Sequence, residues 1–230
     1  MKKILFTILV LLGLFGFIQT NFAEQLSYDR SDFVPVSSVI YDAAYDMRYY
    51  SANNFTGARI NGYNAPVAYM TKEALAALSK AAADLRNQGY RLLIWDTYRP
   101  QKAVDDFVAW INDPNRPGDK SFYPHLQKSE LQKGGYIASK SGHTRGSTID
   151  LTIIKKDGSY VDMGGTFDLF SEISHPDYPN LTAQQKKNRK ILRDAMTKAG
   201  FRGISSEWWH YTLNNEPYKK TYFDFNVEYW

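Results

Sequence analysis

Histidine is scarce in this sequence, which has four, and His143 and His210 each share a short stretch with a carboxylate. His143 and Asp150 share the stretch SGHTRGSTIDLT, and Glu207 and His210 share EWWHY. Zinc binds imidazole nitrogen and carboxylate oxygen, and catalytic zinc sites commonly combine three protein ligands with a water molecule. The two stretches therefore predict a metal site in which His143 and Asp150 are ligands and His210 is the candidate for the third.

Glu207 has the chemistry of a general base beside such a metal. It precedes His210 by three positions, an odd separation that puts the two side chains on opposite faces of a regular strand. If both serve one site, the chain must bend or bulge near Glu207. The carboxylate can then stand beside a zinc-activated water, whose pKa the metal lowers to about 7, and pass its proton to the leaving amine.

A third stretch, WDTYRP, places Arg99 three residues after Asp96, at the expected end of a buried strand. One interpretation is structural, because the arginine can pair with Asp96 or lie in a surface turn. The other is catalytic, because a guanidinium is always charged and, when held at a strand end, can donate to a developing oxyanion. On the second interpretation, loss of Arg99 costs rate more than folding.

Each of these signals also has a plainer explanation. A histidine next to glycine is usually a surface loop residue, a Glu-x-x-His pair is common by chance, and tryptophans beside a histidine usually belong to a core. The joint pattern favours a metal site, because both motifs occur together in a histidine-poor chain. We leave His125 and His175 unassigned and interpret both as loop or surface residues.

The strand expected around Asp150 explains how that carboxylate can reach a site. In STIDLTII, apolar and polar residues alternate, so a period of two turns the apolar side chains to the core and Asp150 to a cleft or water. Gly142 and Gly146 permit a tight loop that carries His143 over the same face. A second alternating segment can present His210 on that open side of the sheet.

The remaining elements follow from hydrophobic periodicity and from residues that begin or end helices. We expect helices over 71–87, 101–112 and 182–199, a buried strand over 90–95, hairpin-like strands after Gly146 and after Ser205, and a loop with a short helix over 120–140. This mixture predicts an α+β fold of a single domain, with a central antiparallel sheet, helices packed on one side and the zinc site on the open face.

The first residues are typical of a secretory signal peptide. Lys2 and Lys3 precede an apolar stretch over 4–18, and small and polar residues follow as far as Ala23. We expect a signal peptide over 1–23, a single domain with the metal site over 24–230, and an exported protein that is periplasmic or secreted. An uncleaved N-terminal anchor is the alternative, although the apolar stretch is short for a membrane span. We expect no stable membrane insertion after cleavage.

The formal net charge of +4 includes Lys2 and Lys3, so the mature chain is only mildly basic. We find no basic stripe with interleaved aromatic residues and expect no nucleic-acid partner. The chain has no cysteine, which leaves no disulfide framework and no lipid-attachment cysteine. The sequence does not set the oligomeric state.

Several stretches resemble one known family. SGHTRGSTIDLT, EWWHY, DTYRP, MRYYSANNFTG, GYIASKSGH and EPYKKTYFDF are similar to the corresponding parts of the VanX-type D-alanyl-D-alanine dipeptidases. These are zinc peptidases of a family that also includes D,D-carboxypeptidases. The resemblance covers essentially the whole mature chain in order, and NNFTG and FDF are typical of the dipeptidase branch.

The resemblance implies a role for each candidate residue. One zinc ion would be held by His143, Asp150 and His210, with Glu207 as the catalytic base. Arg99 would polarise the scissile carbonyl and stabilise the tetrahedral intermediate. The reaction would be hydrolysis of D-Ala-D-Ala to two D-alanines, in a site too small for longer chains.

Two further residues receive substrate-binding roles by the same resemblance. Asp168, in GGTFDLF, would hold the free amino group of the substrate, although an exposed turn aspartate is the plainer interpretation. Ser141 would also contact the substrate. Gly142 stands where members of the family often have a serine, so one hydroxyl that could bind the substrate is missing and fine specificity is left open.

Two other functions compete with the dipeptidase. An exported D,D-carboxypeptidase would trim terminal D-alanine from peptidoglycan stem peptides. A zinc-binding module that has lost catalysis would recognise wall peptides or a partner protein, but it would need neither Glu207 nor Arg99. An exported dipeptidase would recycle or scavenge dipeptides, because an enzyme outside the inner membrane cannot easily deplete a cytoplasmic precursor.

Overall fold

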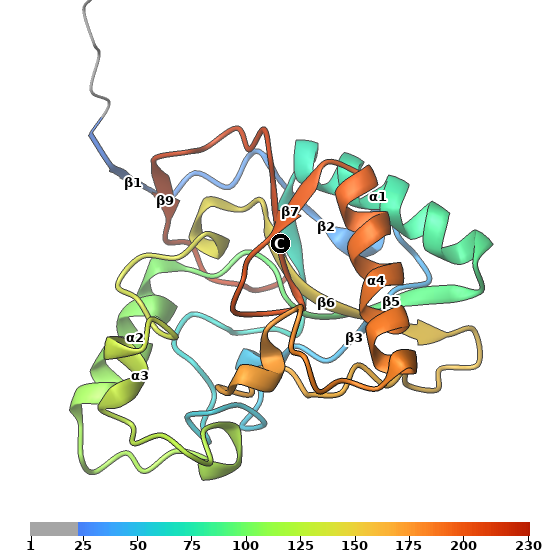
Figure 1. Cartoon of the computed structure of the whole chain (residues 1–230). Helices are drawn as coiled ribbons and strands as arrows, with labels where there is room; N and C mark the ends of the chain where they lie inside the picture. Colours follow the sequence, from blue (N-terminus) through green and yellow to red (C-terminus); the bar gives the residue numbers. More distant parts are fainter. Residues whose placement is uncertain (1–22) are drawn as a thin grey trace, which may run out of the picture.

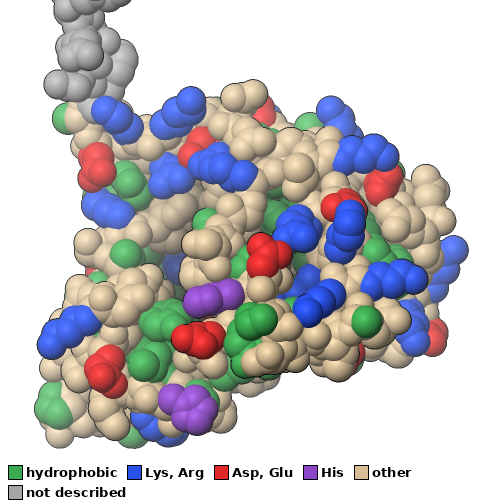
Figure 2. Space-filling view, viewed as in Figure 1, with side chains coloured by type: hydrophobic (Ala, Val, Ile, Leu, Met, Phe, Trp, Pro, Cys, Tyr) green, Lys and Arg blue, Asp and Glu red, His purple; other side chains and the backbone are tan. Residues whose placement is uncertain are grey.

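A computed structural model describes residues 23–230 of the chain (Figure 1). The expected signal peptide lies outside the described residues except for Ala23. Among residues 23–230, none of the helices combines the length and the apolar character that crossing a membrane requires. Figure 2 shows lysine and arginine side chains scattered over the face in view, together with acidic ones.

The central sheet has five strands in the order β3-β5-β6-β8-β7. Neighbouring strands in this sheet are antiparallel, as expected, except for β3 and β5, which are parallel. The strands are β3 (Ala44–Tyr45), β5 (Tyr90–Asp96), β6 (Thr148–Lys155), β8 (His210–Leu213) and β7 (Phe201–Gly203). The pairing of β5, β6 and β8 places Asp96, Asp150 and His210 on neighbouring strands.

Two small sheets join distant parts of the chain. The parallel pair consists of β1 (Gln25–Ser27) and β9 (Thr221–Phe223), and the antiparallel pair consists of β2 (Phe33–Pro35) and β4 (Tyr69–Thr71). The C-terminal tail also caps a helix, because Oδ1 of Asp224 accepts a hydrogen bond from N of Lys102 at 2.7 Å. The tail is therefore part of the framework around the site.

The helices form where the sequence predicts them. They are α1 (Lys72–Asn87), α2 (Gln101–Asn112), α3 (Glu130–Lys133) and α4 (Ala183–Lys198). Helix α1 begins after Thr71, whose side chain accepts a hydrogen bond from N of Ala74. Helix α4 begins with the predicted capping box of Thr182 and Gln185. The region 120–140 is loop with the short helix α3 and a 3-10 turn.

The helices occupy two places around the sheet (Figure 1). Helices α1 and α4 pack against each other and contact β5 and β7 respectively. Helix α2 lies apart from them and borders the face that carries Asp150, through Val104 and Phe107. That face is consequently the wall of a pocket, and Thr148, Asp150 and Thr152 are as buried as the apolar residues between them.

Candidate metal centre and active site

The predicted site residues meet in one pocket of about 210 Å³. It lies against the face of β6 and β8 that carries Asp150, and helix α2 and aromatic side chains form part of its wall. Every candidate from the sequence lines it, namely Arg99, Ser141, His143, Asp150, Asp168, Glu207 and His210. The other two histidines stay outside the pocket: His125 is exposed and His175 is half-buried in a loop.

Three of these side chains turn their ligand atoms toward one another. Nε2 of His143 lies 3.2 Å from Oδ2 of Asp150 and 3.3 Å from Nδ1 of His210. Nδ1 of His210 lies 3.0 Å from Oδ1 of Asp150. Within residues 23–230, this is the group of histidines and carboxylates whose atoms are placed to hold a metal ion, all within 4.8 Å of one another.

Backbone register and one loop produce this cluster. Asp150 and His210 are direct partners in the antiparallel pairing of β6 and β8, so their side chains point to the same face. His143 lies in a 3-10 turn that ends at Gly146, whose φ of 81° suits glycine. Nδ1 of His143 lies 2.7 Å from the carbonyl oxygen of Thr97, which can only accept, so Nδ1 carries the proton and Nε2 is left as the ligand atom.

The cluster fits a divalent cation such as zinc. Asp150 is 2 % exposed, and its Oδ1 makes no hydrogen bond of normal geometry even though His210 lies close to it. Burial opposes ionisation of Asp150, but the nearby imidazoles outweigh it and hold the pKa of this carboxyl well below its usual range. Two imidazoles and one ionised carboxylate make a donor set that zinc accepts.

Glu207 reaches the pocket because the chain turns before β8 begins. Trp208 and Trp209 form a turn, and β8 starts only at His210. The bend required by the odd spacing is therefore present, and Oε2 of Glu207 lies 3.6 Å from Nδ1 of His210. The Glu207 side chain is 19 % exposed, and burial of its carboxylate in the pocket raises its pKa to about 7.

Arg99 makes the ion pair of the structural interpretation and also lines the pocket. Its Nε donates to Oδ2 of Asp96 at 2.9 Å, and its Nη2 lies 3.7 Å from Oδ2 of Asp150. Asp96 is fully buried and also accepts a hydrogen bond from the hydroxyl of Tyr63 at 2.6 Å. The guanidinium is thus anchored by an ion pair while it lines the pocket, where it lies 5.0 Å from the ring centre of Tyr49.

Asp168 is buried, so the plainer interpretation of it as an exposed turn residue is wrong. It is 6 % exposed, has a φ of 56°, and accepts a hydrogen bond from the hydroxyl of Tyr49 at 2.7 Å. Burial raises the pKa of Asp168 well above its usual value, and the charges of Asp150 and Glu207 add to this. An ammonium group in the pocket would supply the countercharge that the ionised carboxylate lacks.

The segment before His143 explains why glycine stands at position 142. Ser141 lines the pocket, and its Oγ accepts a hydrogen bond from N of His143 at 3.2 Å. A Cβ atom on Gly142 would lie 2.9 Å from Oγ1 of Thr148, closer than such contacts allow. Thr148 is itself fixed, because its hydroxyl and that of Thr212 share a hydrogen bond of 2.9 Å.

Two residues that support the site were not predicted from the sequence, namely Tyr49 and Tyr63. The hydroxyl of Tyr49 donates to Asp168, and that of Tyr63 donates to Asp96, which in turn anchors Arg99. The two tyrosines gave no local signal, because their partners are distant in sequence. The pair of Asp96 and Arg99 is the one that the structural interpretation of WDTYRP predicted.

A buried His-Asp-His group beside a second carboxylate and a guanidinium is typical of mononuclear zinc hydrolases. The family model described as D-ala-D-ala dipeptidase, peptidase M15, matches residues 29–228, and the chain belongs to this family.

Curated relatives are similar to this chain over most of its length. The D-alanyl-D-alanine dipeptidase of Enterococcus faecium is 40 % identical over 198 residues, which are 85 % of this chain and 98 % of the relative. That of Escherichia coli K12 is 33 % identical over 185 residues, 80 % of this chain and 86 % of the relative. A solved structure of the LdcB LD-carboxypeptidase aligns with a TM-score of 0.43 and 18 % identity, covering 83 % of this chain and 72 % of that one.

Proposed function

We propose that this protein is an exported, zinc-dependent dipeptidase that hydrolyses D-Ala-D-Ala to two D-alanines. The observation that carries the proposal is the meeting of His143, Asp150 and His210 within 4.8 Å of one another, in a pocket of about 210 Å³ that Glu207 and Asp168 also line. The family to which the chain belongs is described by the same activity.

In this proposal one zinc ion is held by Nε2 of His143, a carboxylate oxygen of Asp150 and Nδ1 of His210. A bound zinc ion supplies Lewis acidity and lowers the pKa of water to about 7. The protein contributes fixed ligand directions. The hydrogen bond from Nδ1 of His143 to Thr97 keeps the imidazole ring oriented and its tautomer defined.

Glu207 is proposed as the general base. Its carboxylate lies beside the ligand group, and its raised pKa of about 7 suits a group that accepts a proton and then releases it near neutral pH. The proton taken from the attacking water would be returned to the leaving amine. The acid–base step therefore needs no second titrating residue.

Arg99 and Asp168 are proposed to hold the scissile carbonyl and the free ammonium group of the substrate. Arg99, fixed by Asp96, would donate to the carbonyl oxygen as negative charge develops there. Asp168, fixed by Tyr49, would bind the substrate ammonium group. Ser141, which lines the same pocket, is proposed as a further substrate contact. A small pocket with a carboxylate at the amino end favours a free dipeptide over an extended peptide.

The decisive measurement is release of D-alanine by the mature, zinc-loaded protein. It is compared with Glu207→Ala, and D-Ala-D-Ala is compared with its N-acetylated form. Cleavage of the free dipeptide alone, lost in Glu207→Ala, supports the dipeptidase. Preference for the acetylated peptide would instead indicate a D,D-carboxypeptidase, and failure to cleave either with zinc still bound would indicate a binding module.

The exported location is part of the proposal and depends on residues 1–23, with their two lysines and apolar stretch. Outside the inner membrane, the enzyme would recycle or scavenge dipeptides. Cell fractionation with N-terminal sequencing of the mature protein tests this location. Full-length protein found in the cytosol would contradict it.

A further inference from the structure

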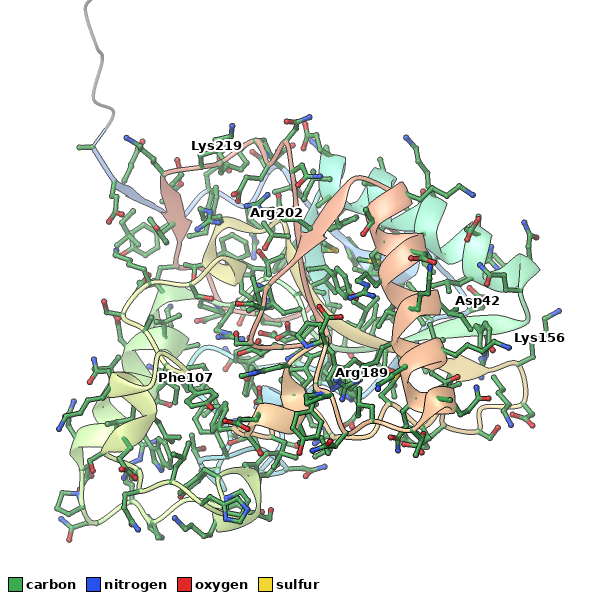
Figure 3. The ribbon with its side chains drawn as sticks, in the orientation of Figure 1. Asp42, Phe107, Lys156, Arg189, Arg202 and Lys219 are labelled. Atoms are coloured by element: carbon green, nitrogen blue, oxygen red, sulfur yellow. The ribbon has the colours of Figure 1, made fainter. Side chains whose placement is uncertain are left out.

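Arg189 lies in α4 and points into the protein, where it is 5 % exposed (Figure 3). Its guanidinium donates three hydrogen bonds, all to main-chain carbonyl oxygens. Nε bonds to Met163 at 2.7 Å, Nη1 to His175 at 2.7 Å and Nη2 to Ile173 at 2.8 Å. Burial lowers the pKa of Arg189 to about 10, so the side chain keeps its charge and all of its donors at neutral pH.

These three carbonyls belong to the segment that carries Asp168. Met163 comes five residues before Asp168 and Ile173 comes five residues after it, so the guanidinium joins the two ends of a loop with Asp168 at its middle. The segment has no regular structure except the 3-10 turn Glu172–Ser174. Asp168 has a positive φ, a conformation that its surroundings have to maintain.

The same guanidinium also contacts the turn that carries Glu207. Its central carbon lies 5.4 Å from the ring centre of Trp208, the residue after Glu207. N of Trp208 donates to the carbonyl of Ser174 at 2.9 Å, which ties this turn to the end of the Asp168 segment. Asp168 and Glu207 both lie outside helices and strands, and Arg189 contacts the segments that carry them.

We propose that Arg189 is a positioning residue of the dipeptidase, which fixes Asp168 relative to Glu207 and thereby aligns the substrate ammonium group with the scissile bond. The inference rests on the proposed function. A lysine at this position would keep the charge but not the planar fork that reaches three carbonyls at once. Misplacement of a binding group by about 1 Å can cost about 100-fold in rate.

The test is a double-mutant cycle on the zinc-loaded protein with D-Ala-D-Ala as substrate. Arg189→Lys alone is expected to lower kcat/KM about 100-fold, through a lower kcat as well as a higher KM, with zinc content unchanged. In an Asp168→Asn background the same change is expected to alter kcat/KM by about twofold or less, because the group that it positions is already lost.

Arg193→Lys is the matched control. Arg193 lies one turn further along α4 and pairs with Asp177, beyond the segment that Arg189 holds. Arg193→Lys is expected to leave kcat and KM unchanged. If Arg189→Lys does not fold, Ser174→Ala replaces it, because the Ser174 hydroxyl donates to the carbonyl of Leu169, next to Asp168, at 2.5 Å. Its loss should also raise KM in an Asp168-dependent way.

Each outcome bears on the inference. If Arg189→Lys lowers kcat/KM by the same factor in the unaltered protein and in the Asp168→Asn background, the arginine is merely structural and the inference is overturned. Full activity of Arg189→Lys beside an active unaltered protein would overturn it while leaving the proposed function intact. An unaltered protein that does not cleave D-Ala-D-Ala would overturn the proposed function and this inference together.

Discussion

Asp150 and His210 lie directly opposite each other on neighbouring antiparallel strands, with Oδ1 of the aspartate 3.0 Å from Nδ1 of the histidine. Cross-strand partners project from the same face of a sheet, so register alone brings two proposed ligands together. His143 joins them from a loop, and its ring is fixed by the carbonyl of Thr97. Two of the three ligands thus come from strands paired in a rigid sheet.

Removal of the metal is expected to destabilise the protein. A ligand present at about 1,000 times its dissociation constant stabilises the folded state by about 4 kcal/mol, and the proposed ligands form a site only when the chain is folded. Thermal melting with a chelator should therefore occur at lower temperature, and added zinc should reverse the change. His210→Gln serves as the control and should show little zinc-dependent shift. Identical melting with and without zinc would contradict the metal site.

Arg99→Lys is expected to lower kcat about 100- to 1,000-fold while zinc stays bound. Arg99 reaches Asp96 with Nε and lines the pocket with the rest of its guanidinium, whereas an ammonium is a point charge that cannot do both. Steady-state kinetics and metal analysis of the purified variant measure this. Arg116→Lys, in the partly exposed pair with Asp106, is the control and should keep full activity. Loss of zinc in Arg99→Lys would show a structural role instead.

Gly142→Ser is expected to destabilise this protein by about 1–3 kcal/mol. The new Cβ would lie 2.9 Å from Oγ1 of Thr148, next to the loop that carries His143. Because Thr148→Ala removes that hydroxyl, Gly142→Ser should destabilise the Thr148→Ala protein less than it destabilises the unaltered one. Chemical denaturation of the two single variants and the double variant measures the coupling. A Gly142→Ser protein as stable as the unaltered one would contradict the prediction and show that the loop rearranges to accommodate the serine.

The pair of Arg86 and Asp42 is expected to make stability depend on pH. Arg86 donates to Asp42 at 2.6 Å and 2.9 Å, and these hydrogen bonds are the main reason that the pKa of Asp42 is lowered. A carboxyl with a lowered folded-state pKa stabilises the fold above its unfolded pKa of about 3.9, and this contribution is lost as pH falls through the folded value.

Asp42→Asn tests this pair directly. It should cost about 0.5 kcal/mol at pH 7, a modest value because the pair is partly exposed. The difference in unfolding free energy from the unaltered protein should shrink as pH falls below about 4. Denaturant titrations at several pH values measure this difference. A difference that stays constant with pH would contradict a stabilising pair between Arg86 and Asp42.

Local patterns predicted the long elements well. The helix over 101–112 has the observed bounds, and the helices over 71–87 and 182–199 differ only by their capping residues. Amphipathic periodicity and caps act within a few turns, so the sequence carries them directly. The two-residue strand β3 and the pair of β1 and β9 were not predicted, because such short strands are defined by partners far along the chain.

The chemistry of the site follows from the residue types. Residue types supplied the donor set, and the alternation in STIDLTII placed Asp150 on the face away from the apolar core. The separation of three residues between Glu207 and His210 indicated a bend near Glu207, and the turn of Trp208 and Trp209 provides it.

Burial and long-range contacts, in contrast, follow only from the fold of the whole chain. The fold buried Asp168 against Tyr49 and placed Arg189 where it joins the two ends of a loop. Periodicity describes neighbours along one element, whereas these contacts join residues from separate segments. Desolvation and hydrogen bonding in the folded chain then set the pKa of each carboxyl, which the composition of the chain does not reveal.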